Sequence, residues 1–348
     1  MRHLYGVETA KARAARALAL ALFHAAPFVL AASPAGARDG LAETADGAFR
    51  AWMRLAGVRD ASLAVAEGET VLGAFGYGAR RPDEPAPVAS LSKAITAACV
   101  GTLVDAGRLS YDTPLGEVLR PVFREHGEPK DGRVGAITVG QLVTHRSGLK
   151  IDSTQRGGTR RLPVDERANR DTFLAALAGG VGDQPGRVHA YNNANYAGLG
   201  LVIETVTGEG YEAYCRRTVL EPLGAGEARI GAGVRVLGAY GGWELSAPAY
   251  ARFTRALAPD GPLLGLKVRA LPEPSPYGLG YRTSRTGRGP VLHHHGSWVG
   301  PTNPPQFGAY FARFPNGVAV VATYDRNVSP DLRAVLAADL ASAVEERP

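Results

Sequence analysis

Segments with the pattern of β-strands lie near both ends of the chain, and a long stretch of mostly helical pattern separates them. Two short strand-like runs, "ASLAVA" and "VLGAFGYG", flank a turn that begins after residue 66. Strand signals return only late, in "YGLGYRTS", "PVLHHHG", "FGAYFARF" and "GVAVVATYD". Because both sets of strands need partners, we expect a single sheet built from the two ends, with a helical insertion between them.

This organisation predicts two structural units after a leader. We assign residues 38–85 together with 240–348 to an α/β sheet unit, and residues 86–239 to a mostly helical unit. Helices are also expected in "AETADGAFRAWMRLAGV" and in the last segment, "SPDLRAVLAADLASAV", where Ser329 and Pro330 suit a first turn. A cleft between such units is a common place for a ligand site.

The first 37 residues have the pattern of a secretory signal peptide. Basic residues precede the apolar run "ALALALFHAAPFVLAA", and "AGA" at 35–37 supplies the small residues of a cleavage site. An uncleaved anchor is the alternative, but the run is short and is interrupted by His24 and Pro27. We therefore expect cleavage after Ala37, export to a secreted or periplasmic location, and no stable membrane insertion.

Charge and cysteine content limit the partners of the chain. The leader carries four basic residues and one acidic residue, so it accounts for three of the six net positive charges. The remaining charge is too small to indicate a nucleic-acid partner. Two cysteines, Cys99 and Cys215, lie in helical patterns without metal-ligand spacing, and the sequence favours two buried free thiols over a disulfide.

A Ser-x-x-Lys pattern occurs twice, at Ser90 to Lys93 and at Ser147 to Lys150. Residues three apart on a helix share a face, so an amine can approach a hydroxyl. Small or apolar residues follow Ser90 from 94 to 104, as in a buried helix, whereas Gly148 marks the second pattern as a loop. Ser90 is the better nucleophile, although a plain helix cap with a solvated lysine explains this segment alone equally well.

Two further motifs favour the catalytic interpretation. The chain contains one Tyr-x-Asn, at Tyr191 to Asn193, and a His-x-Gly-x-x-x-Gly pattern that begins at His294. The order Ser-x-x-Lys, Tyr-x-Asn and basic-residue-x-Gly resembles the serine β-lactamase and penicillin-binding-protein superfamily. The branch with class C β-lactamases, D-alanyl-D-alanine carboxypeptidases and related esterases is the most similar. "ITVGQLVTHRSGL" and "YGLGY" are also like segments of that family, and the resemblance covers about residues 60 to 335.

The resemblance implies an α/β (α+β) fold of β-lactamase type, with an antiparallel sheet flanked by helices and a mostly helical inserted domain. It implies that Ser90 attacks a carbonyl and becomes acylated, while Lys93 helps to remove the hydroxyl proton. Tyr191 would be a second acid/base group, for which nearby cations would have to lower the phenol pKa. Asn193 would bind the substrate amide or stabilise Lys93, with Asn192 and Asn195 as its nearest rivals.

By the same resemblance, the backbone N–H groups of Ser90 and Ser297 would form the oxyanion hole. Gly296 would permit close backbone approach beside them, although an ordinary strand-end glycine is the alternative. The third motif has His294 where many members have lysine, and a mostly neutral histidine makes efficient β-lactam hydrolysis less expected. Arg285-Thr286-Gly287 is closer in sequence to the Lys-Thr-Gly motif of many members, but its surroundings predict a turn between two strands.

Three adjacent histidines also raise a metal site as an alternative. His293 and His295 would face one side of a strand, but "HHHGSW" has no neighbouring acidic residue, so we expect neither metal nor cofactor. His145 is expected to stabilise a loop by hydrogen bonds. Ser92, on the other side of the helix from Ser90, is expected to pack or to begin the helix.

The sequence therefore predicts an exported serine hydrolase that acts through an acyl-enzyme on Ser90. Small-molecule esters or amides are the first substrate class, and D-amino-acid peptides or peptidoglycan-like substrates are the second. A true β-lactamase and a non-catalytic penicillin-binding or cell-wall-sensing module are the alternatives. The presence of Ser90, Lys93 and Tyr191 together argues against the hypothesis of a non-catalytic module.

Overall fold

The computed structural model describes residues 40–155, 167–258, 261 and 277–345. All of them belong to one compact unit, which runs from Arg38 to Pro348. The predicted signal peptide lies outside the described residues. The predicted boundaries of the sheet and helical units, between 85 and 86 and between 239 and 240, stay predictions.

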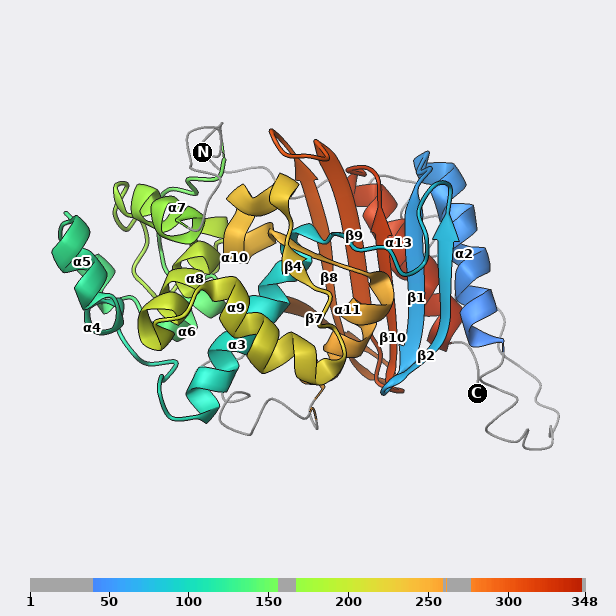
Figure 1. Ribbon diagram of the computed structural model, residues 1–348, viewed down its shortest axis with the longest axis horizontal. Helices are drawn as coiled ribbons and strands as arrows, with labels where there is room; N and C mark the ends of the chain where they lie inside the picture. Colours follow the sequence, from blue (N-terminus) through green and yellow to red (C-terminus); the bar gives the residue numbers. More distant parts are fainter. Residues whose placement is uncertain (1–39, 156–166, 259–260, 262–276, 346–348) are drawn as a thin grey trace. The chain divides into compact units, whose positions relative to one another are not determined.

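A seven-stranded antiparallel sheet forms one side of this unit, in the order β2-β1-β10-β9-β8-β7-β6 (Figure 1). The first strand pairs with the last along its whole length, from Ala61 opposite Tyr324 to Glu67 opposite Val318. The prediction that both ends of the chain build one sheet is therefore confirmed. The strands are β1 (Ala61–Glu67), β2 (Thr70–Tyr77), β6 (Tyr277–Gly278), β7 (Tyr281–Thr286), β8 (Gly289–Val299), β9 (Gln306–Arg313) and β10 (Val318–Tyr324).

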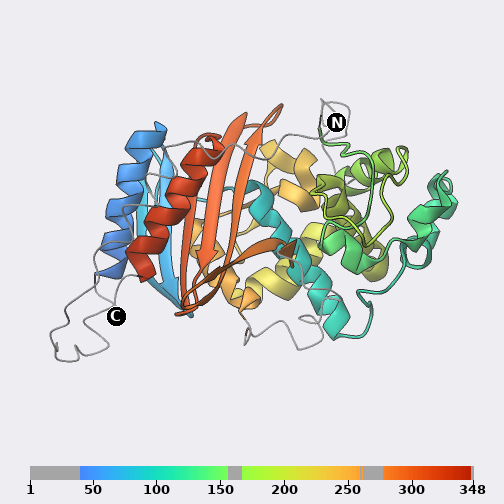
Figure 2. The same cartoon turned by 180° about the vertical axis from the view of Figure 1, so that it is seen from behind.

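Two helices, α2 (Leu41–Ala56) and α13 (Pro330–Glu345), lie side by side on one face of the sheet (Figure 2). Their apolar sides bury large residues such as Phe49, Trp52 and Leu336 against the strands. The indole N–H of Trp52 donates to the carbonyl of Leu332 at 2.7 Å, which joins the two helices. Ser329 accepts from the N–H of Leu332, as a helix cap does.

The opposite face of the sheet packs on the helical part of the chain, with α3 (Ser92–Asp105) at its centre (Figure 1). Nearly every side chain from Ser92 to Val104 is buried, which explains why this helix has small or apolar residues on all sides. The other α-helices are α4 (Leu115–Val118), α5 (Arg120–His126), α6 (Val139–Val143), α7 (Ala168–Leu177), α8 (Asn193–Thr207), α9 (Tyr211–Cys215), α10 (Gly238–Gly241) and α11 (Ala247–Phe253).

Short elements connect these helices to the sheet. A small three-stranded sheet, β3 (Ala86–Pro87), β5 (Trp243–Leu245) and β4 (Arg229–Ile230), leads into the segment that carries Ser90. The 3-10 turns are η1 (Ala89–Leu91), η2 (Gly132–Ala136), η5 (Glu221–Leu223), η6 (Ala232–Leu237) and η7 (Thr254–Leu257), and η4 (Arg216–Leu220) is a π turn.

A disulfide joins Cys99 to Cys215, so the expectation of two free thiols is wrong. The two residues are 116 positions apart, and helical periodicity places each in a helix without showing which helices pack together. The fold brings α9 against α3 with the two Cα atoms 5.5 Å apart, a separation that suits a bridge. Across the part of the chain that the structure describes, we find no helix long and apolar enough to span a bilayer.

Candidate active site

Ser90 lies in the short turn η1, between the small sheet and the start of α3. The preceding residue, Ala89, has a φ of 48°, a left-handed conformation that a non-glycine residue adopts only when its surroundings hold it there. Tyr250 provides part of that support, because its hydroxyl donates to the carbonyl of Leu91 at 2.8 Å. The turn presents the Ser90 hydroxyl at the mouth of the buried helix.

Lys93 is fully buried one turn further on, and its Nζ atom lies 3.2 Å from Oγ of Ser90. The amine donates to Oδ1 of Asn193 and to the carbonyl of Tyr240, both at 2.8 Å. Burial lowers the pKa of Lys93 to about 7, although the Asp152 carboxylate opposes that shift. A neutral amine has two N–H groups and one lone pair, so two carbonyl acceptors leave the lone pair for the Ser90 proton.

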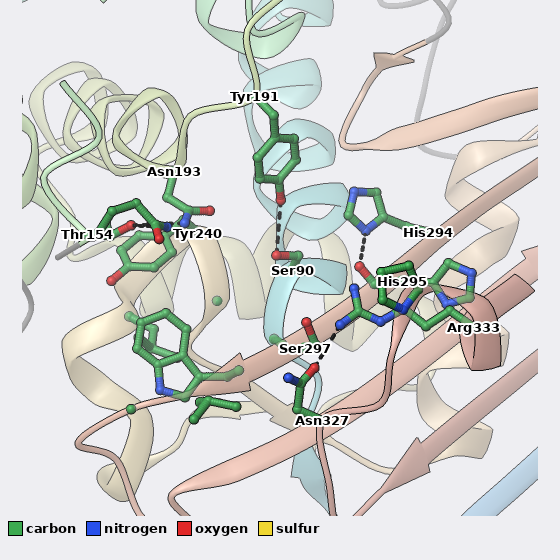
Figure 3. A pocket seen from close by; sticks show the side chains of 18 of the residues that line it. Ser90, Thr154, Tyr191, Asn193, Tyr240, His294, His295, Ser297, Asn327 and Arg333 are labelled. Atoms are coloured by element: carbon green, nitrogen blue, oxygen red, sulfur yellow. Dashed lines mark hydrogen bonds between the residues drawn. The ribbon is translucent and has the colours of Figure 1, made fainter. Parts of the chain in front are cut away.

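Tyr191 approaches Ser90 from the other side, and its hydroxyl donates to Oγ at 3.0 Å (Figure 3). The residue is 37% exposed at the cleft, but its hydroxyl points toward Ser90. Burial of that end raises the pKa of Tyr191 well above its usual range, and the bond to Ser90 opposes this only in part. Tyr191 is therefore a protonated hydroxyl, suited to giving a proton to a leaving group.

Three asparagines follow Tyr191 closely, and the structure distinguishes them. Asn193 bonds to Lys93 and donates its amide to Oγ1 of Thr154 at 2.9 Å. Asn192 caps helix α8 by accepting from the N–H of Ala194 at 2.9 Å. Asn195 is fully buried and lies beside His145. Of the three, Asn193 reaches the lysine.

Strand β8 forms the wall opposite Tyr191, with His294 and Ser297 lining the same pocket as Ser90 (Figure 3). Gly296 packs against the Ser90 turn, where an added Cβ would lie 2.4 Å from the carbonyl oxygen of Val88. The ladder between β7 and β8 ends at Arg282 opposite His293. Strand β8 therefore continues beyond its neighbour into the pocket, with Gly296 as the residue that lets it approach the turn.

His294 is buried, and its Nδ1 atom lies 2.7 Å from the carbonyl oxygen of His295. Burial, helped by the nearby Lys93 amine, lowers the pKa of His294 well below its usual range. The imidazole is therefore neutral and cannot act as a cation that lowers the pKa of Tyr191. The cations that line the pocket are Arg282 and Arg333 instead.

The pocket encloses about 860 Å³, within the usual range of small-molecule sites. Its walls combine polar groups around Ser90 with the apolar side chains of Leu237, Trp298 and Val299. An elongated substrate can therefore place a carbonyl at Ser90 and an apolar group against β8.

A family model described as Beta-lactamase matches residues 45–345, which is most of the chain. The chain belongs to the beta-lactamase family. This confirms the resemblance stated from the Ser-x-x-Lys, Tyr-x-Asn and His-x-Gly motifs, and with it the β-lactamase-like α/β fold with an antiparallel sheet. As a member of this family, the protein is a hydrolase.

Proteins similar to this beta-lactamase-family chain include a penicillin-binding protein and two amidohydrolases of solved structure. Penicillin-binding protein 4 of Amycolatopsis lactamdurans is 30% identical over 189 residues, which are 50% of this chain and 46% of that protein. The match thus spans less than half of the relative. A D-stereospecific amidohydrolase from Streptomyces sp. has a TM-score of 0.69 at 22% identity, over 86% of this chain and 98% of that one.

The D-amino acid amidase of Ochrobactrum anthropi SV3, solved with L-phenylalanine amide, has a TM-score of 0.70. It is 19% identical, over 88% of this chain and 98% of the amidase. At these identities the two solved structures establish the fold that this family member shares with them.

Several groups in the site of this beta-lactamase-family hydrolase have no signal in the sequence. The carbonyl of Tyr240 bonds to Lys93 through backbone atoms, which every residue has. Thr154 and Asp152 hold Asn193 from a loop that matches none of the three motifs. Arg333 lies in the first turn of α13, where a basic residue is usually a solvated surface group. An arginine on a sheet-packed helix is only a weak indication of a ligand site.

The residues that were not predicted to be catalytic have structural roles away from the Ser90 hydroxyl. Ser147 is buried and donates to Oδ1 of Asn195 at 2.7 Å. Ser92 begins α3 and accepts from the N–H of Trp243, as its expected packing role requires. Arg285 and Thr286 end strand β7 rather than lie in the expected turn, and only Gly287 falls between β7 and β8; none of the three lines the pocket around Ser90.

The other two histidines of the triplet differ in their surroundings, since His295 lines the pocket beside His294 and His293 does not. His293 lies 2.8 Å from Oγ of Ser284 through its Nε2 atom, and His295 stacks on Tyr310 with ring centres 4.4 Å apart. Among the described residues, no group of three metal-ligating side chains is close enough together to hold an ion.

Proposed function

We propose that this chain is an exported serine hydrolase that cleaves small amides and esters through an acyl-enzyme on Ser90. One observation carries the proposal: Oγ of Ser90 lies between Nζ of Lys93, at 3.2 Å, and the hydroxyl of Tyr191, at 3.0 Å. The first group has a lone pair to take a proton, and the second has a proton to give. A nucleophile between a base and an acid is the arrangement that acyl transfer requires.

In the acylation step, Oγ of Ser90 forms a bond to the substrate carbonyl carbon while its proton moves to Nζ of Lys93. The backbone N–H groups of Ser90 and Ser297 are proposed to stabilise the oxyanion. As the carbon–nitrogen or carbon–oxygen bond breaks, the Tyr191 hydroxyl protonates the leaving group, and Lys93 returns a proton to Tyr191. Water then attacks the acyl-enzyme with the same groups acting in reverse order.

Within this class, the substrates that we propose are amides of D-amino acids and amides of short D-peptides. The fold is shared with proteins named as a D-amino acid amidase and a D-stereospecific amidohydrolase. The apolar wall of Leu237, Trp298 and Val299 suits a hydrophobic side chain on the acyl group. The neutral His294 imposes no demand for a negatively charged substrate near Ser90.

A second candidate is a penicillin-binding D,D-peptidase or a β-lactamase, and the arginines of the pocket favour it. Both β-lactams and D-alanyl-D-alanine peptides have a carboxylate, which a guanidinium binds well. Arg333 lines the pocket near Ser297 and donates to Oδ1 of Asn327 at 2.7 Å (Figure 3). Arg282 is a second cation in the same pocket. Either could supply the charge that the third motif lacks.

Export remains part of the proposal, and the buried disulfide supports it. Disulfides form and persist in oxidising compartments and are rare in the cytosol. The bridge between Cys99 and Cys215 therefore suits the secreted or periplasmic location predicted from residues 1–37. Expression of the full chain in a bacterial host tests it: the exported product should begin at residue 38. An intact N-terminus in the cytosolic fraction would contradict export.

Covalent labelling tests the hydrolase proposal directly. The purified protein, from residue 38 onward, is treated with a serine-directed phosphonate and separately with a penicillin, and peptide mass spectrometry then locates any adduct. We expect a phosphonate adduct on Ser90. Absence of an adduct with both reagents would overturn the enzyme proposal and leave a non-catalytic module.

The fate of the penicillin adduct and a substrate panel then separate the candidates. A persistent penicillin adduct favours a penicillin-binding peptidase, whereas rapid loss with hydrolysed product favours a β-lactamase. We expect D-amino-acid amides and p-nitrophenyl esters to be cleaved faster than D-alanyl-D-alanine peptides. The reverse order would favour the peptidase.

A further inference from the structure

His145 bonds to both chain neighbours of Tyr191. Its carbonyl oxygen accepts from the backbone N–H of Ala190 at 2.9 Å, and its Nδ1 atom accepts from the backbone N–H of Asn192 at 3.3 Å. The amide of Asn195 lies 3.1 Å from the same Nδ1 atom. A single buried histidine therefore holds the segment on either side of the tyrosine that contacts Ser90.

The tautomer of His145 follows from these partners. A backbone N–H can only donate, so Nδ1 of His145 must carry a lone pair. The amide of Asn195 also presents its NH₂ group to Nδ1, because the hydroxyl of Ser147 donates to its oxygen at 2.7 Å. That hydroxyl in turn accepts from the N–H of Leu149. The ring proton of a neutral His145 therefore resides on Nε2.

The His145 ring also supports the Tyr191 ring. The two ring centres are 4.3 Å apart, and Tyr277 packs on the same imidazole at 4.6 Å. The backbone of His145 has a φ of 55°, which is unfavourable for a residue with a side chain. The surrounding bonds hold this conformation, and it allows the carbonyl and the ring of one residue to reach the same segment.

We propose that His145 is the positioning residue for Tyr191, holding the phenol hydroxyl against Ser90 through a neutral imidazole that accepts at Nδ1. The inference rests on the proposed hydrolase function, because it assigns a role within that reaction. His145 does not touch the substrate pocket or the Ser90 hydroxyl. Its effect passes through the backbone of residues 190–192 and through the face of the Tyr191 ring.

Burial keeps His145 neutral, because it lowers the pKa of this ring well below its usual range. The neighbouring groups Lys93, His189, His294 and Arg282 further disfavour a proton on His145 when they are themselves charged. A protonated ring would carry an N–H toward the N–H of Asn192, so the positioning bond and neutrality require each other.

Three variants test the proposal. His145→Asn retains an acceptor near the place of Nδ1 and tolerates a left-handed backbone, whereas His145→Ala has no acceptor. We expect His145→Ala to lower kcat about 10²-fold with KM changed less than about threefold, because Tyr191 is misplaced and the pocket is not. His145→Asn should recover at least about tenfold of that loss. His126→Ala is the control, since this histidine at the end of α5 lies beside Glu125 and outside the pocket, and it should keep wild-type kcat.

A structural role alone gives a different result. Circular dichroism and thermal unfolding identify variants that fail to fold, and activity is compared only between folded proteins. Equal losses in His145→Asn and His145→Ala, or a rise in KM at unchanged kcat, would overturn the proposal.

Nitrogen-15 NMR of histidine-labelled protein provides a readout that does not depend on activity. The expected signature of His145 is a neutral ring with the proton on Nε2 and no titration between about pH 5 and 8. A ring protonated at Nδ1, or one that titrates in this range, would overturn the proposal even in an active enzyme. The expected NMR signature in a protein that the phosphonate does not label would contradict the proposed function instead.

Discussion

Nζ of Lys93 lies 3.2 Å from Oγ of Ser90 with none of the lysine exposed to solvent. Because Asn193 and Tyr240 take its two N–H bonds at neutral charge, the lysine is poised as a base rather than as a surface cation. The predictions that follow test this relationship and the elements that hold it.

Replacing the nucleophile should abolish turnover. We expect Ser90→Ala to lower kcat at least about 10³-fold, since no other hydroxyl occupies its place between Lys93 and Tyr191. Ser147→Ala is the matched control, because it removes the other serine of a Ser-x-x-Lys pattern. It loses two buried hydrogen bonds, one to Asn195 and one from the N–H of Leu149, and should stay within about tenfold of wild type. Steady-state hydrolysis of a p-nitrophenyl ester measures both, and loss of activity in Ser147→Ala alone would mean that the wrong serine was chosen.

The three catalytic groups should behave as a unit. Lys93→Ala and Tyr191→Phe should each lower kcat severely, because one removes the base and the other the leaving-group acid. Each combined with Ser90→Ala should fall no further than Ser90→Ala alone, since the step that they assist is already lost. Double-mutant cycles measure this coupling. Strictly additive losses would indicate that the three side chains act independently.

Activity should increase with pH through the titration of Lys93. Burial lowers the pKa of this lysine to about 7, so it is charged and unable to accept a proton below that pH, and neutral above it. We expect kcat/KM to rise from pH 6 to 8 with a midpoint of about 7. Lys93→Arg should be inactive throughout, because a guanidinium stays protonated. Lys150→Arg, an exposed change in the loop, should keep the wild-type profile. A flat profile would argue against Lys93 as the base.

The approach of β8 to the Ser90 turn should depend on Gly296. A Cβ there would lie 2.4 Å from the Val88 carbonyl oxygen, so Gly296→Ala must move the strand and with it the N–H of Ser297. We expect kcat to fall about 10²-fold, the usual cost of an oxyanion donor. Gly287→Ala, where an added Cβ meets no atom within 4 Å, is the control and should leave kcat unchanged. An active Gly296→Ala would show that the donors lie elsewhere.

The disulfide should contribute substantially to stability. It closes a separation of 116 residues, and in the chain-entropy account a long loop gains more from a crosslink than a short one. Replacing both Cys99 and Cys215 by alanine should lower the free energy of unfolding by about 2–5 kcal/mol. Urea unfolding measures this change, with the reduced wild-type protein as the comparison. Equal stability with and without reductant would contradict a formed bridge.

Hydrophobic patterns and the order of the motifs along the chain predict much of the fold. Short, almost continuously apolar runs at 61–67 and 318–324 indicate buried strands, and the need of such strands for partners predicted that the two ends meet in one sheet. The apolar run after Ser90 indicated a helix buried on all sides, and Gly148 separated the two Ser-x-x-Lys patterns. These are local signals, since each depends on residues close in the chain.

Tertiary structure decided what depends on residues distant in the chain. The pairing of Cys99 with Cys215, the neutrality of His294 and the lowered pKa of Lys93 all follow from which helices and strands pack together. The carbonyl of Tyr240 is a backbone atom, which carries no residue-type signal, and His145 reaches the segment around Tyr191 only because the fold brings its loop there. The sequence alone determined which residues can do chemistry. Burial and distance, which only the fold sets, decided their protonation and their partners.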